Sequence, residues 1–107
     1  MKKLIRDGKV AVLISPGFGA GWYTWHRVEE LLFDPKVVEM LEAKSKLDDI
    51  EKYCEDTYGK GPEKYIYLGG LGDLKVFWLP VGTLFRIDEY EGSESLQVKE
   101  DMHWMVA

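Results

Sequence analysis

Hydrophobic and polar positions alternate near the start of the chain and predict a first β-strand over residues 9–15. Val10, Val12 and Ile14 give that strand one wholly apolar side, while its other side is only partly polar. This pattern is typical of a strand covered on one face and partly covered on the other. We expect the strand to end at Pro16, because proline has no N–H to donate to a sheet.

The period then changes to that of a helix. Asp34-Pro35 is a typical helix start, with aspartate as the N-cap and proline in the first turn, where its missing N–H costs nothing. A second start follows at Ser45, where an acidic residue three positions later resembles a capping box, and the apolar period stops at Gly59. The pattern predicts two short helices, or one helix with a break near residues 43–46.

The C-terminal part of the chain returns to a period of two and predicts an antiparallel meander. The links at residues 80–82 and 91–93 fit tight hairpin connections, and residues 69–73 are typical of a turn. The expected strands are residues 65–68, 75–79, 83–90, one through Leu96 and Val98, and 103–106.

The order of β, then α, then a run of β predicts an α+β fold. We expect a small antiparallel β-meander that the N-terminal strand joins, with one or two short helices packed on one face. Two alternatives stay open: a small barrel with a helical insertion, or a homo-oligomer that completes its core across a dimer interface.

Length and composition favour one domain over residues 1–107. The chain has 107 residues, of which 13% are aromatic, including four tryptophans, so we expect a ring-rich core or an aromatic binding surface. No stretch approaches the roughly 20 apolar residues of a membrane span, and no signal-peptide pattern is present. The single cysteine, Cys54, has no internal disulfide partner. These features predict a cytoplasmic protein without a membrane partner.

The net charge of −5 argues against duplex nucleic acid as a partner, because that binding depends on Lys and Arg neutralising phosphates. Residues 1–33 nevertheless carry five basic and three acidic side chains, a local charge of +2. A small anion in a local basic pocket, or a basic protein docked on an acidic face, remains compatible with this balance.

Residues 15–26 are the most unusual segment, since glycines and aromatic residues alternate there directly after a strand. Glycine permits close backbone approach and aromatic rings supply large apolar surfaces, so the combination suggests a shaped recognition surface as well as a structural turn. The glycine spacing matches neither the dinucleotide fingerprint nor the phosphate loop that ends in Gly-Lys-Ser/Thr. The candidate ligand-binding residues are Phe18, Gly19, Gly21, Trp22, Tyr23, Trp25, His26, Arg27 and Arg86.

No catalytic residue, metal site or cofactor is predicted. The two histidines, His26 and His103, lie in no metal-ligand motif, and His26 is more typical of a structural histidine than of a general base. Cys54 falls on an apolar helix stripe, as a buried small hydrophobic residue would. The acidic tract at residues 88–94 is typical of a solvated turn or of a docking surface for a basic partner.

Three blocks of sequence resemble a family of small uncharacterised proteins of tailed bacteriophages and prophages. The blocks are residues 19–25 (GAGWYTW), 32–35 (LFDP) and 81–94 (VGTLFRIDEYEGSE). The resemblance covers most of the chain but carries no catalytic residue over to it. It implies a phage accessory protein made in the host cytoplasm, and such proteins often sequester a signalling nucleotide or block a host protein.

Two functions follow as hypotheses. The first is non-catalytic binding of a small anionic or nucleotide-like ligand, in which rings stack a planar group and Arg27 and Arg86 meet its charge. The second is an acidic protein-interaction module that inhibits a host protein, with exposed rings as anchors and acidic regions for steering.

Overall fold

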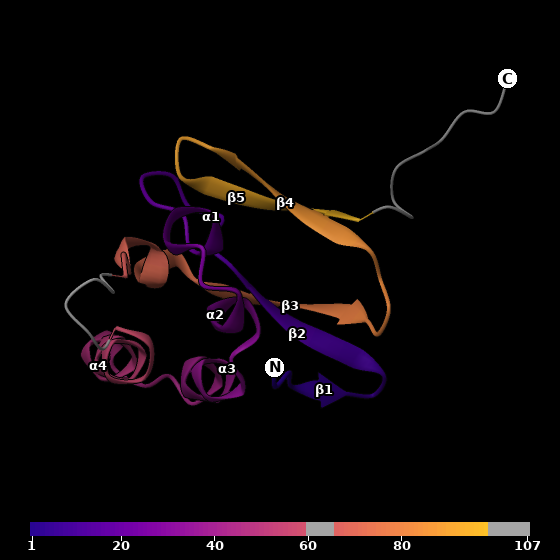
Figure 1. Ribbon diagram of the computed structural model, residues 1–107, viewed down its shortest axis with the longest axis horizontal. Helices are drawn as coiled ribbons and strands as arrows, with labels where there is room; N and C mark the ends of the chain where they lie inside the picture. Colours follow the sequence, from indigo (N-terminus) through magenta and orange to yellow (C-terminus); the bar gives the residue numbers. More distant parts are fainter. Residues whose placement is uncertain (60–65, 99–107) are drawn as a thin grey trace, which may run out of the picture.

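The computed structural model describes residues 1–59 and 66–98, and within them the chain forms two antiparallel β-units and a group of short helices (Figure 1). The first unit is a three-stranded sheet in the order β1-β2-β3, and the second is the hairpin of β4 and β5. The strands are β1 (Ile5–Arg6), β2 (Lys9–Ile14), β3 (Lys75–Pro80), β4 (Phe85–Tyr90) and β5 (Ser93–Val98).

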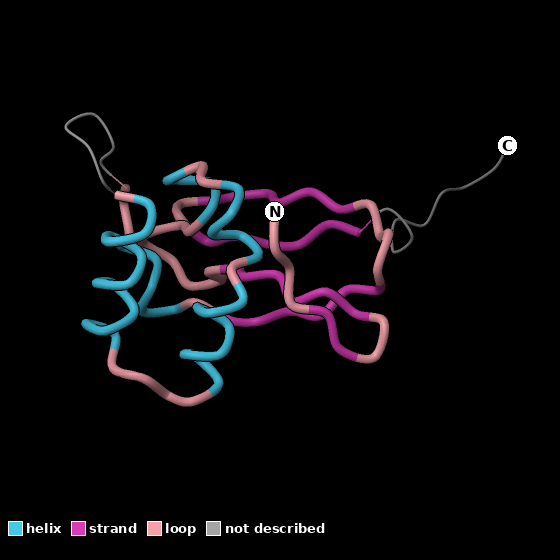
Figure 2. The backbone as a smooth tube through the Cα atoms, turned by 60° about the horizontal axis from the view of Figure 1, so that its bottom comes forward, coloured by secondary structure: helices cyan, strands magenta, loops and turns pink. Residues whose placement is uncertain are grey.

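The helices gather at one end and one side of these strands (Figure 2). They are α1 (Tyr23–His26), α2 (Glu29–Phe33), α3 (Pro35–Glu42), α4 (Leu47–Tyr58) and the 3-10 helix η1 (Gly69–Asp73). The predicted α+β class, with the N-terminal strand in an antiparallel sheet, is confirmed. None of the described helices has the length and apolar character that crossing a membrane would require.

Strand β2 is the centre of the core, because both of its faces are covered. Ala11 and Leu13 face the cluster that contains residues of α3 and α4, whereas Val12 and Ile14 face the β4–β5 hairpin. In Figure 1, helices α3 and α4 lie on one side of β2 and β3, and the β4–β5 hairpin lies on the other. On the side expected to be only partly covered, Ala11 and Leu13 are fully buried and Lys9 is exposed.

The helix starts and stops are only partly as expected. The Asp34 carboxylate caps α3 by accepting from the backbone N–H groups of Lys36 and Val37, which confirms the predicted N-cap. The prediction of a capping box at Ser45 was wrong, because α4 starts after Lys46 and Lys46 makes no side-chain cap hydrogen bond. The break between two helices and the stop at Gly59 are confirmed.

The strand pairing differs from a continuous meander. The link at residues 80–82 does not form the expected hairpin, since β3 pairs with β2 and β4 pairs with β5. The turn at 91–93 does join two paired strands, with Tyr90 opposite Ser93. Residues 66–68 are not a strand; residue 65 and the expected strand at 103–106 lie outside the described residues.

Three elements were not expected: α1, α2 and β1. Strand β1 pairs with β2, and the turn between them is formed by Asp7 and Gly8, both of which have positive φ. An Asp-Gly pair between two apolar segments is a recognised hairpin signal, so β1 could have been found from the sequence.

Leu13 provides a test of the doubly covered strand. The substitution Leu13→Ala should lower the free energy of unfolding by about 2–5 kcal/mol, because it leaves a cavity in a fully buried site. Leu84→Ala is the matched control: Leu84 is 65% exposed, so its loss should change stability by no more than about 0.5 kcal/mol. Urea unfolding followed by tryptophan fluorescence measures both, and equal losses would contradict this description of the core.

Candidate functional site

A buried carboxylate holds the glycine- and aromatic-rich segment against the β4–β5 hairpin. Glu94 of β5 is 2% exposed. One of its oxygens accepts from the backbone N–H of Ser15 at 2.9 Å, and the other accepts from the backbone N–H and hydroxyl of Thr24 at 2.9 and 2.7 Å. The backbone N–H of Glu94 donates in turn to the Ser15 carbonyl at 2.9 Å. The two ends of the segment are therefore fixed by one side chain.

The turn of the hairpin packs directly on the same segment. The backbone N–H of Gly19 donates to the Glu91 carbonyl at 3.0 Å, and the Ser93 hydroxyl donates to the Pro16 carbonyl at 2.6 Å. Gly92 has φ +86°, and a Cβ there would lie 2.5 Å from the Ala20 nitrogen. A glycine is needed at this position for both its backbone conformation and the close approach.

The aromatic residues of the segment divide into buried and exposed ones. Trp22 is completely buried and its indole N–H donates to the Leu31 carbonyl at 2.9 Å, so its ring has no surface to offer a ligand. Tyr23 is half-buried and packs against both core clusters. Trp25 and Phe18 are 41% and 72% exposed.

His26 is held as a neutral ring. Its Nδ1 accepts from the backbone N–H of Val28 at 2.9 Å, and the ring lies edge-to-face with Trp22 at 4.7 Å. Burial lowers the pKa of His26 to about 4. Its Nε2 is buried and has no hydrogen-bond partner among the described residues. These contacts describe a structural histidine.

The two arginines are not brought to the rings by any described hydrogen bond or ion pair. Arg27 ends α1 in a left-handed conformation and its side chain is exposed. Arg86 lies on the outer face of the hairpin, where it pairs with Asp88 at 3.4 Å. Glu89, which contacts Trp25, is an odd number of residues away on the same strand and so faces the other side. The candidate residues therefore do not form one pocket.

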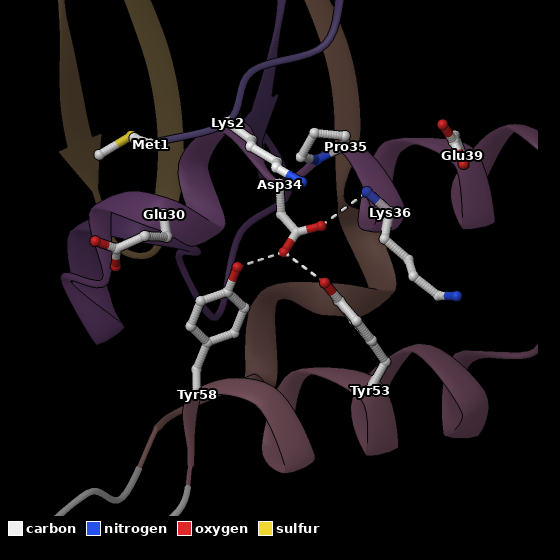
Figure 3. A pocket seen from close by; sticks show the side chains of 9 residues that line it. All are labelled: Met1, Lys2, Glu30, Asp34, Pro35, Lys36, Glu39, Tyr53 and Tyr58. Atoms are coloured by element: carbon white, nitrogen blue, oxygen red, sulfur yellow. Dashed lines mark hydrogen bonds between the residues drawn. The ribbon is translucent and has the colours of Figure 1, made fainter.

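A different set of residues surrounds a cavity of about 440 Å³ between the start of α3 and the side of α4 (Figure 3). Asp34 is the centre of its wall and is 3% exposed. One carboxylate oxygen accepts from the N–H groups of Lys36 and Val37 at 2.8 and 3.1 Å. The other accepts from the hydroxyls of Tyr53, at 2.9 Å, and Tyr58. All four strong acceptor positions of the carboxylate are thus used within the protein.

The two tyrosines stay protonated at neutral pH. Desolvation is the largest cause and the hydrogen bond to Asp34 the second, and together they raise the pKa of Tyr53 to about 12. The same two causes raise the pKa of Tyr58. Each hydroxyl hydrogen is directed at Asp34, and a hydroxyl oxygen in this state can still accept a hydrogen bond. The remaining lining residues are Met1, Lys2, Glu30, Pro35, Lys36 and Glu39.

This cavity was not predicted from the sequence, and Asp34 was identified only as a helix cap. Tyr53 and Tyr58 lie 19 and 24 residues further along, and no local pattern brings them to the α3 N-terminus. The only available signal was that both tyrosines fall on the apolar side of a predicted helix, where buried hydroxyls need partners.

The other reactive side chains offer little chemistry. Burial raises the pKa of the Cys54 thiol to about 12, so the thiol stays protonated at neutral pH. Among residues 1–59 and 66–98, no group of three or more His, Cys, Asp and Glu side chains is placed to hold a metal ion. Comparisons with protein-family models, curated proteins and solved structures found no match for this chain.

The substitution Glu94→Gln tests the buried carboxylate. Replacing one oxygen by an amide places a donor against other donors, so the free energy of unfolding should fall by about 1–3 kcal/mol. Glu91→Gln, at an exposed position in the adjacent turn, should change it by less than about 0.5 kcal/mol. Guanidinium unfolding separates the two variants, and an unaffected Glu94→Gln protein would show that the carboxylate does not hold the hairpin.

His26 predicts a pH dependence of stability. Its pKa in the folded protein, about 4, is below the unfolded value of 6.5, so the unfolded state takes up a proton first as the pH falls. The contribution of neutral His26 to the free energy of unfolding is fully present above pH 6.5 and is lost as the pH falls from 6.5 to 4. Stability should be roughly 1–2 kcal/mol lower at pH 5 than at pH 7, after allowance for solvent screening.

Thermal unfolding at a series of pH values measures this slope. His26→Asn keeps an acceptor for the Val28 N–H but removes the ring nitrogen that titrates. Between pH 7 and 5 the variant should show a flatter profile than the wild type, and identical profiles would contradict the role of His26.

Proposed function

We propose that the protein is a phage-type accessory protein that binds a small, anionic, nucleotide-like ligand without transforming it, in the cavity beside Asp34. The observation that carries the proposal is the convergence of two tyrosine hydroxyls on one saturated, buried carboxylate in the wall of that cavity. A volume of about 440 Å³ falls within the usual range of small-molecule sites.

The tyrosines would recognise donor groups of the ligand. Because Asp34 fixes both O–H directions, the Tyr53 and Tyr58 oxygens are acceptors set before the ligand arrives. A ribose hydroxyl or an exocyclic amine is the kind of group that such acceptors bind. Preset acceptors reduce the entropy lost on binding.

The charged residues at the cavity define the rest of the ligand. Lys2 and Lys36 supply two amines for a phosphate or carboxylate. Glu30 and Glu39 balance that charge, so an anion with no donor groups of its own would be a poor fit. A molecule with an anionic group at one end and hydroxyl or amino groups at the other satisfies both sets.

Binding without catalysis is favoured by the state of the polar groups. The Asp34 carboxylate has no free acceptor position and cannot serve as a general base. The raised pKa values of Tyr53 and Tyr58 oppose a phenolate role. In the host cytoplasm, a protein of this kind would act by sequestering a signalling nucleotide.

Titration with cyclic dinucleotides, ADP-ribose and inorganic phosphate tests the proposal. At least one nucleotide should raise the melting temperature by several degrees at about 100 times its dissociation constant. Lys36→Gln and Lys2→Gln should each weaken binding about tenfold, as the loss of a charge-assisted hydrogen bond predicts.

Lys52→Gln, on the exposed side of α4, is the matched control and should bind as the wild type does. Calorimetry supplies the affinities. A flat response across the nucleotides, or equal weakening by all three lysine variants, would contradict the proposed site.

A further inference from the structure

Trp25 and Tyr67 form an exposed aromatic pair that the small-ligand cavity does not use. Their ring centroids lie 5.1 Å apart with an interplanar angle of 33°. The two residues are 41% and 36% exposed, although they come from parts of the chain far apart in sequence. Exposed rings held together in this way are typical of contact surfaces more than of folding cores.

Each ring packs against the backbone of a glycine, and this contact limits the movement of the ring. A Cβ at Gly21 would lie 2.6 Å from Cδ1 of Trp25, and a Cβ at Gly69 would overlap the Tyr67 ring. The backbone therefore packs against each ring more closely than any other residue would permit. Rings fixed before contact lose little conformational entropy when a partner binds.

A carboxylate borders this pair. Oε1 of Glu89 accepts from the indole N–H of Trp25 at 3.3 Å and from the backbone N–H of Gly92 at 2.6 Å. Its second oxygen has no hydrogen bond within residues 1–59 and 66–98. The side chain is thus oriented by two donors and still has an acceptor to offer.

The charge nearby is negative. Glu89 and Glu91 lie close together around the end of β4, whereas Asp88 lies on the outer face, where it meets Arg86. The chain as a whole has a net charge of −5. A phosphate-bearing strand that stacked its bases on the rings would meet these carboxylates, so single-stranded nucleic acid is disfavoured.

We propose that Trp25, Tyr67 and Glu89 form a docking site for a basic, arginine-containing segment of a partner protein. A guanidinium plane can stack on an indole face and at the same time direct an N–H at a carboxylate. Lysine cannot do both as well, because its charge is compact and not planar. The site is separate from the Asp34 cavity and does not rest on the function proposed for it.

The probes are two nine-residue peptides that differ only in their basic residues, one with glycine and arginine alternating and one with lysine in place of arginine. The Trp25 indole N–H resonance, assigned by its absence in Trp25→Phe, reports binding at the site. The arginine peptide should shift this resonance and bind at least about fivefold more tightly than the lysine peptide. Equal binding of the two peptides, or no shift of the resonance, would overturn the proposal.

Variants of the full chain locate the contact. Trp25→Ala and Glu89→Gln should each weaken the arginine peptide about tenfold. Tyr90→Ala is the control, because Tyr90 is a 69% exposed ring on the outer face of β4. Circular dichroism checks folding first, and Glu89→Gln, which keeps the side-chain volume, carries the test if Trp25→Ala is unfolded.

Two results would overturn the proposal even if the peptide binds. One is an unchanged affinity in both Trp25→Ala and Glu89→Gln. The other is tighter binding of a poly-dT oligonucleotide than of the arginine peptide, with loss of that binding in Trp25→Ala.

Discussion

The Glu94 carboxylate is the interaction on which the assembly of this fold depends. It lies inside the protein, where an uncompensated charge is costly, and within the described residues no lysine or arginine forms an ion pair with it. Its compensation consists of three donors from Ser15 and Thr24. Because Ser15 follows β2 and Thr24 belongs to α1, one side chain on β5 sets the position of the hairpin relative to the sheet and the first helix.

That tie explains how a two-stranded hairpin can cover a strand without pairing with it. A hairpin alone is marginally stable, and β4–β5 gains its stability from Ile87 and Leu96 packed over Val12 and Ile14. The carboxylate and the turn contacts at Gly92 keep those side chains in register. Residues 19–24 and 91–94 are the segments that meet here.

Local sequence patterns were sufficient for some elements and insufficient for others. Asp34-Pro35 marked the start of α3 because capping is settled by neighbouring residues, and Asp7-Gly8 carried a hairpin signal for the same reason. By contrast, the Ser15–Glu94 contact spans 79 residues, and the tyrosines that meet Asp34 come from a separate helix. The aromatic segment was expected to act as one surface, but burial separates Trp22 from Trp25, and only tertiary packing decides which ring faces water.

Asp34 has a consequence for how this protein can change over evolutionary time. The same carboxylate ends a helix, joins α3 to α4 and shapes a cavity, so a substitution there alters folding and any recognition at the cavity together. Lys2 and Lys36, in contrast, have exposed side chains at the cavity, and the Lys36 amine lies 5.7 Å from the centroid of the Tyr53 ring. Exchange of either lysine leaves the Asp34 hydrogen bonds to Tyr53 and Tyr58 in place, so the charge at the cavity can change while the aspartate and its two tyrosines are kept.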